Sequence, residues 1–449
     1  MPEIMKDSTL TRRDDKPPQN GRWLYILILL GVMHILMDAR YRIVHLFPSK
    51  AFGFAILGML YLALSVILTF THPRPHALFR HLSRLIQSAL SPLQKVGRRW
   101  LVPGICGTLL LMILASCLAR WFYMTRIPIA THLADMLPLI QQACDGFADG
   151  SNPYRTVYKM PWTLPLTFWP GMWLPYLPLR LQGIDIRWLH LVVVVGIAAV
   201  FCVLILRCVL ERNWSLMTTF PATFIALFLF LFSTEPIFFA GIGHTPPQWA
   251  WIALLCAAIL ARRPYLTAVT LGLLLATRQT AVVFAPLIAI YWLRSSASWR
   301  TTLKLTVVTC ATFLVICGYF LLTAPYEFTI APLKHYASLG DWDFTRGSAS
   351  FSADTIGLAF PLRTMQGKCL LSVSMLLAIF LPITSAWRRL RDETDLILYM
   401  SLATVAVTLV SPIPWHYEYF PALLLTSFAA ISAARQEDIQ CDRDREPHR

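Results

Sequence analysis

The stretch THLADMLPLIQQACDGFADGSNPYRTVYKMP, residues 131–161, is polar in a chain otherwise built mostly of apolar runs. It contains three aspartates, an Asn-Pro-Tyr turn at 152–154 and one lysine, Lys159. Because charged groups and unpaired backbone are costly inside hydrocarbon, a polar loop between apolar helices is expected outside the bilayer. The sequence therefore predicts a loop at the membrane surface that carries the chemistry, held there by membrane helices.

The composition of the whole chain is that of a membrane protein. Of its 449 residues, 56% are hydrophobic and 14% charged, and the mean hydropathy is +0.57, whereas soluble domains have about 25% charged residues. The net charge of +15 comes from basic residues between the apolar runs, where they set topology. No nucleic-acid partner is therefore expected. The ten cysteines have no paired spacing, so neither a disulfide framework nor a zinc site is implied.

The apolar runs predict an all-α polytopic membrane protein with about 12 transmembrane helices. The predicted spans are residues 23–37, 52–71, 101–123, 188–210, 216–232, 249–261, two short helices within 264–293, 304–322, 369–387, 396–410 and 419–434. The two short helices meet at a polar turn, 277–280, which is typical of segments that line a cavity. Both termini are expected in the cytoplasm, and only the basic loop near Arg40, Arg42 and Lys50 breaks the positive-inside rule.

Two segments do not fit a simple spanning helix. Residues 78–93 are amphipathic and basic, and are expected to lie along the cytoplasmic face. Residues 162–181 are apolar but hold four prolines, so we expect an interfacial or half-inserted element with its aromatic residues at headgroup depth.

The chain divides into three predicted parts. Residues 1–100 form a cytoplasmic N-terminus, two extra transmembrane helices and a basic linker. Residues 101–434 form a transmembrane core with a first outer loop at 124–187 and a second at 325–368. Residues 435–449 form a charged cytoplasmic tail.

Asp135 is the first candidate for a catalytic group, because it follows the third predicted span closely enough to lie just above the bilayer. A carboxylate there could take a proton from an attacking hydroxyl. The alternative is that it caps a helix beginning at Met136. Asp145 and Asp149 flank glycines and are expected to be solvated turn residues. With only His132 near them, they do not form the ligand cluster that a metal needs.

Lys159 and Arg278 are the cations that could bind a lipid phosphate through charge-assisted hydrogen bonds. Arg278 stands between two short apolar helices, where an unpaired charge would be expensive. The alternatives are an interfacial anchor for Lys159 and a structural salt bridge or snorkelling for Arg278.

Several polar-aromatic turns are further candidates for substrate binding. They suit a sugar, and they equally suit an aromatic belt at the membrane interface. The residues are Asn152, Tyr154, His244, Gln248, His335 and His416.

The order of these motifs resembles the membrane glycosyltransferases of the GT-C fold, especially the polyprenol-phosphate-mannose-dependent mannosyltransferases (glycosyltransferase family 87). An outward span is followed by an aspartate, a glycine step into Asn-Pro-Tyr, a Lys-x-Pro, a proline-rich segment and a span that opens with arginine. The matching residues are Asp135, Ala143, Gly150, Asn152, Pro153, Tyr154, Lys159, Pro161, Arg187, the turn 241–248 and the helix 271–287. The resemblance covers residues 101–434. Arg278 stands where the family usually has lysine, and Trp162 where it has a second proline.

The resemblance implies a GT-C-like bundle that transfers one sugar, with mannose favoured, from a polyprenyl-phosphate donor to an exoplasmic lipid or glycan acceptor with inversion. Asp135 would act as the base or orient the acceptor, and Lys159 and Arg278 would hold the donor phosphate. Such enzymes work with or without a divalent cation, and no other cofactor is implied. The compact loops favour a bacterial plasma membrane with a periplasmic active site.

The main alternative is a polytopic transporter or lipid-linked sugar flippase, which would have polar residues midway along its spans and two matching halves. Only Arg278 fits that pattern, and no halves match. An O-antigen ligase or polymerase would need a late outer loop richer in arginine and histidine than residues 325–368.

Overall fold

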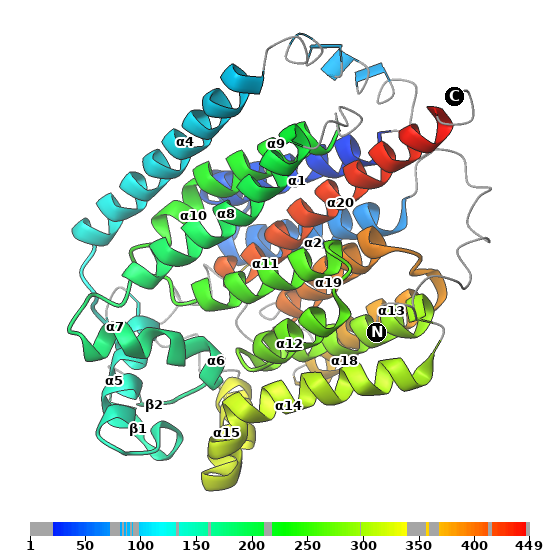
Figure 1. Ribbon diagram of the computed structural model, residues 1–449. Helices are drawn as coiled ribbons and strands as arrows, with labels where there is room; N and C mark the ends of the chain where they lie inside the picture. Colours follow the sequence, from blue (N-terminus) through cyan, green and yellow to red (C-terminus); the bar gives the residue numbers. More distant parts are fainter. Residues whose placement is uncertain are drawn as a thin grey trace, which may run out of the picture.

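The protein is a bundle of α-helices with one small β-hairpin (Figure 1). The computed structural model describes residues 21–71, 98–131, 134–159, 163–210, 218–296, 298–338, 368–411 and 415–445, with short pieces in 81–92 and at 356–358. The long helices are α1 (Arg22–Val44), α2 (Lys50–Phe70), α4 (Arg98–Arg126), α8 (Trp188–Leu210), α9 (Thr219–Phe232), α11 (Pro246–Leu260), α12 (Pro264–Leu275), α13 (Phe284–Ser296), α14 (Trp299–Thr323), α18 (Lys368–Arg389), α19 (Glu393–Leu409) and α20 (Phe420–Arg445). The smaller elements are α5 (Met136–Ala148), η1 (Pro153–Arg155), β1 (Val157–Lys159), β2 (Thr163–Pro165), α6 (Pro170–Trp173), η2 (Leu174–Tyr176), α7 (Leu177–Leu181), α10 (Thr234–Phe238), η4 (Gln279–Val283), α15 (Pro325–Ser338) and η5 (His416–Tyr419).

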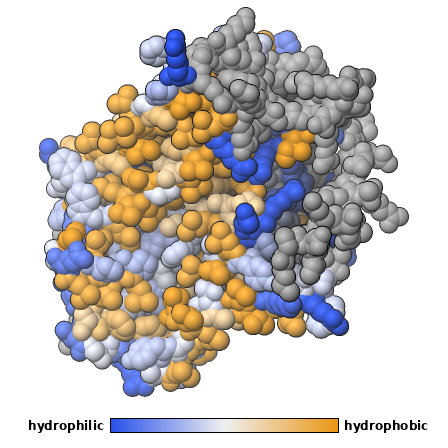
Figure 2. Space-filling view, in the orientation of Figure 1, coloured by the Kyte–Doolittle hydropathy of each residue, from blue (hydrophilic) through white to orange (hydrophobic). Residues whose placement is uncertain are grey.

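Among the described residues, five helices, α1, α2, α4, α8 and α14, are long and apolar enough to cross a membrane, and α9, α11 and α12 are shorter apolar helices. Their outward-facing side chains are themselves apolar, as Leu111, Val192 and Val315 show by being more than half exposed. Figure 2 shows apolar residues spread across one face of the bundle, with hydrophilic ones gathered toward its edges. An apolar exterior of this extent is typical of an integral membrane protein.

The core is centred on α20, which packs against α1, α9, α11 and α19. Trp23 of α1 is fully buried in this core. Helix α1 runs to Val44, seven residues beyond the predicted end of the first span, so Arg40 and Arg42 belong to a helix and not to the predicted loop. Arg40 is tolerated inside the helix because it is buried against Glu235 of α10, with which it forms an ion pair.

One end of the bundle, which we call the basic end, joins the first and last helices through buried polar contacts. The Gly21 N–H donates to Glu437 of α20 at 2.6 Å, and Arg22 pairs with Asp395 of α19 at 2.7 Å. The side chain of Asp438 accepts four hydrogen bonds from the backbone and hydroxyl groups of Thr218 and Thr219, at 2.5 to 3.1 Å. These bonds satisfy donors at the N-terminus of α9 that no carbonyl within the helix can reach.

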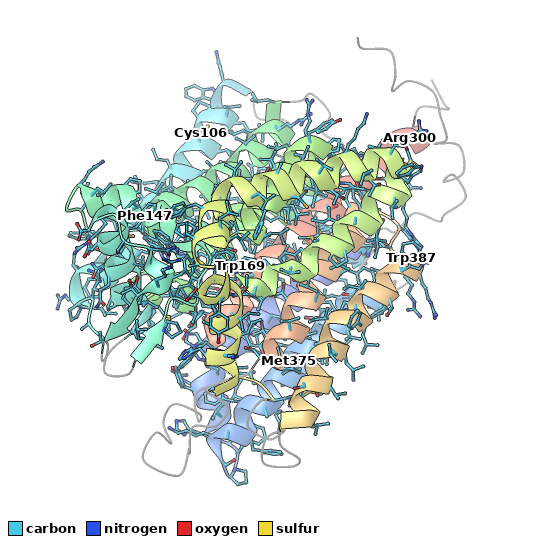
Figure 3. All side chains as sticks on the ribbon, turned by 90° about the horizontal axis from the view of Figure 1, so that it is seen from below. Cys106, Phe147, Trp169, Arg300, Met375 and Trp387 are labelled. Carbon is cyan, nitrogen blue, oxygen red and sulfur yellow. The ribbon has the colours of Figure 1, made fainter. Side chains whose placement is uncertain are left out.

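The opposite end is covered by α5, α6, α7, the β1–β2 hairpin and α15 (Figure 1). In Figure 3, Phe147 lies at this end, Trp169 lies inward of it near the middle of the view, and Arg300 and Trp387 lie at the other end. A separate apolar cluster holds the layer together, with Tyr154, Trp173 and Phe328 buried in it. The proline-rich segment is divided into β2, α6, η2 and α7, which confirms that it is not one straight helix.

The predicted break within residues 264–293 is confirmed, because α12 ends at Leu275 and α13 begins at Phe284. The second predicted outer loop begins with α15, and most of its remainder lies outside the described residues. Most of the amphipathic segment 78–93 and His132 also lie outside them.

Candidate functional site

The break between α12 and α13 is held open by the layer of loops that covers it. The Gly171 N–H donates to Ala276 O at 2.8 Å, and the Trp169 N–H donates to Thr277 O at 3.1 Å. A Cβ on Gly171 would stand 2.8 Å from Ala276 O, so only glycine permits this approach. The proline-rich segment thus bonds to the carbonyls of the two residues that follow α12. This contact fixes the position at which the chain continues into Arg278.

Arg278 forms a buried ion pair with Glu418 of η5, with 3.1 Å between Nη2 and Oε1. The two side chains are 10% and 15% exposed. The Arg278 guanidinium also lies over the ring of Phe168, 5.6 Å from its centroid. Burial raises the pKa of Glu418, and the nearby Arg278 charge opposes this rise. The sequence interpretation of Arg278 as one half of a salt bridge is therefore confirmed, with a partner that lies 140 residues away in the chain.

A small cleft lies beside this pair, and its polar lining residues are Gln248, Arg278, Thr280, Thr404, Thr408 and Glu418. Several buried polar atoms around it have no hydrogen-bond partner among the described residues. They are His244 Nε2, Thr245 Oγ1, Gln248 Oε1 and Thr167 Oγ1. Buried polar atoms without a partner are exceptional in folded proteins. Donors and acceptors gathered beside a buried cation could bind a hydroxyl-rich ligand that carries an anionic group.

His244 belongs to this group through its position in the turn before α11. Its ring packs 4.6 Å from that of Phe168 and 5.3 Å from that of Tyr417, measured between centroids. Burial, and secondarily the charge of Arg278, hold the pKa of His244 well below its usual value, so the ring is neutral at pH 7. A neutral imidazole can accept a hydrogen bond as well as donate one.

A second buried charged cluster lies at the same end. Glu235 of α10 pairs with Arg40, and its Oε2 stands 3.5 Å from His416 Nε2. The Glu235 N–H donates to the Asp38 side chain at 3.3 Å. Burial raises the pKa of Glu235, and it lowers that of His416, with the charge of Arg40 acting in the same direction on the histidine. Phe239 links the two clusters, since its ring packs near both His244 and His416.

Asp135 is half-buried at the residue before α5, and its side chain makes no capping hydrogen bond to that helix. Asp135 thus occupies the N-cap position that the cap interpretation predicted, without the side-chain hydrogen bond of a cap, while the catalytic interpretation stays a prediction. Lys159 ends β1 and pairs in register with Thr163 of β2. The roles of Asp135 and Lys159 toward a substrate stay predictions.

Asn152 and Tyr154 are engaged within the loop layer. Asn152 donates to Thr323 Oγ1 at 2.8 Å and accepts from the Tyr154 N–H at 3.0 Å. The buried Tyr154 hydroxyl donates to Phe168 O at 2.6 Å and accepts from Trp173 Nε1 at 3.2 Å. Tyr154 thus positions Phe168, whose ring lies under Arg278, and Asn152 ties its turn to α14. Any contact of either residue with substrate stays a prediction.

His335 lies in α15. Of the loop acids, Asp145 lies in α5 and Asp149 directly follows that helix. His335 is half-buried, and burial lowers its pKa. Asp145 pairs with Arg180 at 2.6 Å in a partly exposed bridge, and Asp149 is exposed. Within the described ranges, no group of three or more histidine, cysteine or acidic side chains could hold a metal ion.

Sequence reasoning missed Glu418 and Glu235 as members of these clusters. Both acids stand in short polar stretches that read as surface turns, and only the fold shows that they face buried arginines. The sequence did contain a usable signal. A buried cation in an apolar protein needs an acid as its partner, and few acids stand near the apolar runs, so few candidates had to be considered.

Comparison with protein-family models, with curated proteins and with solved structures gave no match.

Proposed function

We propose that this protein is a membrane glycosyltransferase that moves a sugar, mannose being favoured, from a polyprenyl-phosphate donor to a lipid or glycan acceptor. The observation that carries the proposal is the cleft at the α12–α13 break. It brings the unpartnered Gln248 Oε1 to the same wall as a buried arginine, Arg278, and the buried, unpartnered His244 Nε2 belongs to a ring on which the Arg278 charge acts. A sugar phosphate attached to a lipid has the same combination of anionic, hydroxyl-bearing and apolar parts.

The donor phosphate would compete with Glu418 for Arg278. A phosphate offers more acceptor oxygens than a carboxylate, and arginine can bind it bidentately. Glu418, released from the arginine in a buried position, would then favour its protonated form because burial already raises its pKa. Binding of the donor would thus couple to proton uptake at Glu418.

In the reaction, the oxygen of an acceptor hydroxyl forms a bond to the anomeric carbon of the sugar. The bond from that carbon to the phosphate oxygen breaks, and polyprenyl phosphate leaves with the electron pair. Asp135 takes the hydroxyl proton, and Arg278 with Lys159 stabilises the charge that develops on the phosphate. Attack opposite the leaving group inverts the configuration at the sugar carbon.

The orientation that we propose follows from charge. With about 12 spans, the arginine-rich end of the bundle faces the cytoplasm and the cleft faces the exoplasm. Two arginines support this arrangement: Arg300 lies at the end opposite the loop layer, and Arg294 bonds to the carbonyl of Trp387 at that same end (Figure 3). We propose a bacterial plasma membrane with the site on the periplasmic side.

The test uses purified full-length protein in lipid nanodiscs with polyprenyl-phosphate mannose and a lipid acceptor extract. Donor binding and sugar transfer are measured for the wild type, Arg278→Gln, Asp135→Asn and the control Arg180→Gln, which removes a charge from the partly exposed pair in the loop layer. We expect Arg278→Gln to lose donor binding and Asp135→Asn to lose transfer while it still binds donor. A wild type that binds no polyprenyl-phosphate sugar would refute the proposal.

The transporter or flippase alternative is favoured by one observation, the break between α12 and α13. Discontinuous helices with a charged residue at the break are common in transporters. The two functions are separated by a sealed-vesicle assay in which a fluorescent polyprenyl-phosphate sugar is followed across the bilayer. Movement across the bilayer without transfer to acceptor would select the transporter.

A further inference from the structure

The basic end of the bundle contains a cavity of about 120 Å³ between the last turns of α2 and α18. The lining residues are Thr69 and Phe70 of α2, Arg389 at the end of α18, Arg391 just after that helix, and Asp395 and Tyr399 of α19. It lies at the end of the molecule opposite the Arg278 cleft, so it is a separate site.

Among the residues that line this cavity, the charge is positive on balance. Asp395 is neutralised by Arg22, at 2.7 Å, and it also accepts a hydrogen bond from the Arg391 N–H at 3.1 Å. The guanidinium of Arg294 is bonded to the carbonyls of Trp387 and Leu390, which keeps a further cation beside the cavity. The described residues that line the cavity thus include two arginines, Arg389 and Arg391, and one acid, Asp395.

The two arginines have the exposure that ligand binding requires. Arg389 and Arg391 are exposed, and the Arg389 guanidinium rests over the Phe70 ring, 5.1 Å from its centroid. Phe70 packs edge-on against Tyr399, with 5.9 Å between ring centroids, and this pair forms an apolar floor. The Tyr399 hydroxyl, bonded to Ser385 Oγ at 3.1 Å, adds a donor at the wall.

Apolar surface continues from the cavity along both helices. Ile67 of α2 and Phe380, Leu381 and Trp387 of α18 are exposed at 36%, 57%, 59% and 58%. A ligand with an anionic head and apolar chains would place its head among the arginines and its chains against these side chains. Soluble anions would gain nothing from the apolar part.

We propose that this cavity binds the phosphate of a negatively charged membrane phospholipid. The arginines Arg389 and Arg391 bind the phosphate oxygens, and the acyl chains lie along α2 and α18. Basic pockets between membrane helices recognise anionic headgroups in this way. The site stands independently of the glycosyl transfer proposed above.

The test compares purified full-length protein in phosphatidylcholine nanodiscs with and without phosphatidylglycerol. Lipids retained after transfer to detergent are counted by native mass spectrometry. The test variant is Arg389→Gln with Arg391→Gln. The control is Arg388→Gln with Arg300→Gln, which removes the same charge from the same end without touching the cavity wall.

We expect the wild type and the control to retain phosphatidylglycerol, and the test variant to bind it about thirtyfold more weakly, from the contribution of two arginines near a charged lipid. Equal retention by all three proteins would overturn the proposal. A second arm adds inorganic phosphate to protein in neutral lipid and follows thermal stability. If phosphate alone stabilised the wild type as much as the charged lipid does, the ligand would be a soluble oxyanion and the lipid assignment would be wrong.

Discussion

Replacing Arg278 with glutamine should destabilise the protein by an amount that depends on pH. The replacement leaves Glu418 buried without its cation, since the carboxylate is 15% exposed and lies 3.1 Å from the guanidinium. At that distance, and at an effective dielectric constant of about 20, the lost attraction is about 5 kcal/mol. The carboxyl group can limit this loss by taking up a proton.

The free-energy cost of protonating Glu418 limits how strongly Arg278→Gln destabilises the protein. A glutamate with the usual pKa of 4.5 is protonated at a cost of about 1.4 kcal/mol per pH unit above that value. The loss of unfolding free energy that Glu418 causes in the Arg278→Gln variant is therefore at most about 1.4 kcal/mol at pH 5.5 and about 4 kcal/mol at pH 7.5. The sign follows from the raised pKa of Glu418 in the folded state: its contribution to stability is fully present below pH 4.5 and is lost as pH rises toward the folded-state pKa.

The assay is a denaturation titration in mixed micelles at pH 5.5 and 7.5 that yields the free energy of unfolding. It includes Arg278→Gln, the double variant Arg278→Gln with Glu418→Gln, and the control Arg180→Gln. We expect the double variant to recover most of the loss at pH 7.5, because a neutral amide replaces the stranded acid. The reasoning fails if the single variant loses the same free energy at both pH values, or if the second substitution restores nothing.

Three further predictions concern an acid that caps a helix, a closely packed glycine and a partly exposed ion pair. Asp438→Ala should lower the free energy of unfolding by about 3 kcal/mol, because it leaves buried donors at the start of α9 without an acceptor; the same titration measures it. Gly272→Ala should cost about 1–3 kcal/mol, since its Cβ would stand 2.6 Å from a carbonyl of α14, whereas Gly104→Ala, with nothing within 4 Å, should not destabilise. Arg180→Gln should change the thermal midpoint little, because it breaks a partly exposed pair with Asp145 worth at most about 1 kcal/mol.

Sequence reasoning located helices best where local signals agree. The span predicted at 188–210 is α8, Trp188–Leu210, because an unbroken apolar run there follows a turn and ends at a basic residue. The end of α1 was placed too early because Arg40 reads locally as a boundary. Its partner, Glu235, lies nearly two hundred residues further along the chain, so no local pattern can show that the charge is neutralised within the fold.

The candidate site was predictable only in part, because local sequence patterns do not show partners that lie far away in the chain. A cation between apolar helices demands a partner, and this drew attention to Arg278. The identity of that partner depends on how η5 packs against the α12–α13 break, which is a tertiary property. Tyr154 shows the converse case, because its motif suggested a ligand-binding role while its hydroxyl is engaged by Phe168 and Trp173.

Helix α1 connects the first part of the chain to the proposed chemistry. It supplies Arg40 to the cluster that holds Glu235 and His416, and His416 is two residues from Glu418, the partner of Arg278. Without Arg40, Glu235 would keep its burial and lose the charge that lowers its pKa, so the pKa of Glu235 would rise further, and His416 would lose the Arg40 charge that lowers its own pKa. Helix α1 therefore sets the electrostatics around His416, beside the η5 turn that supplies Glu418, although the resemblance to a glycosyltransferase core begins only after α1.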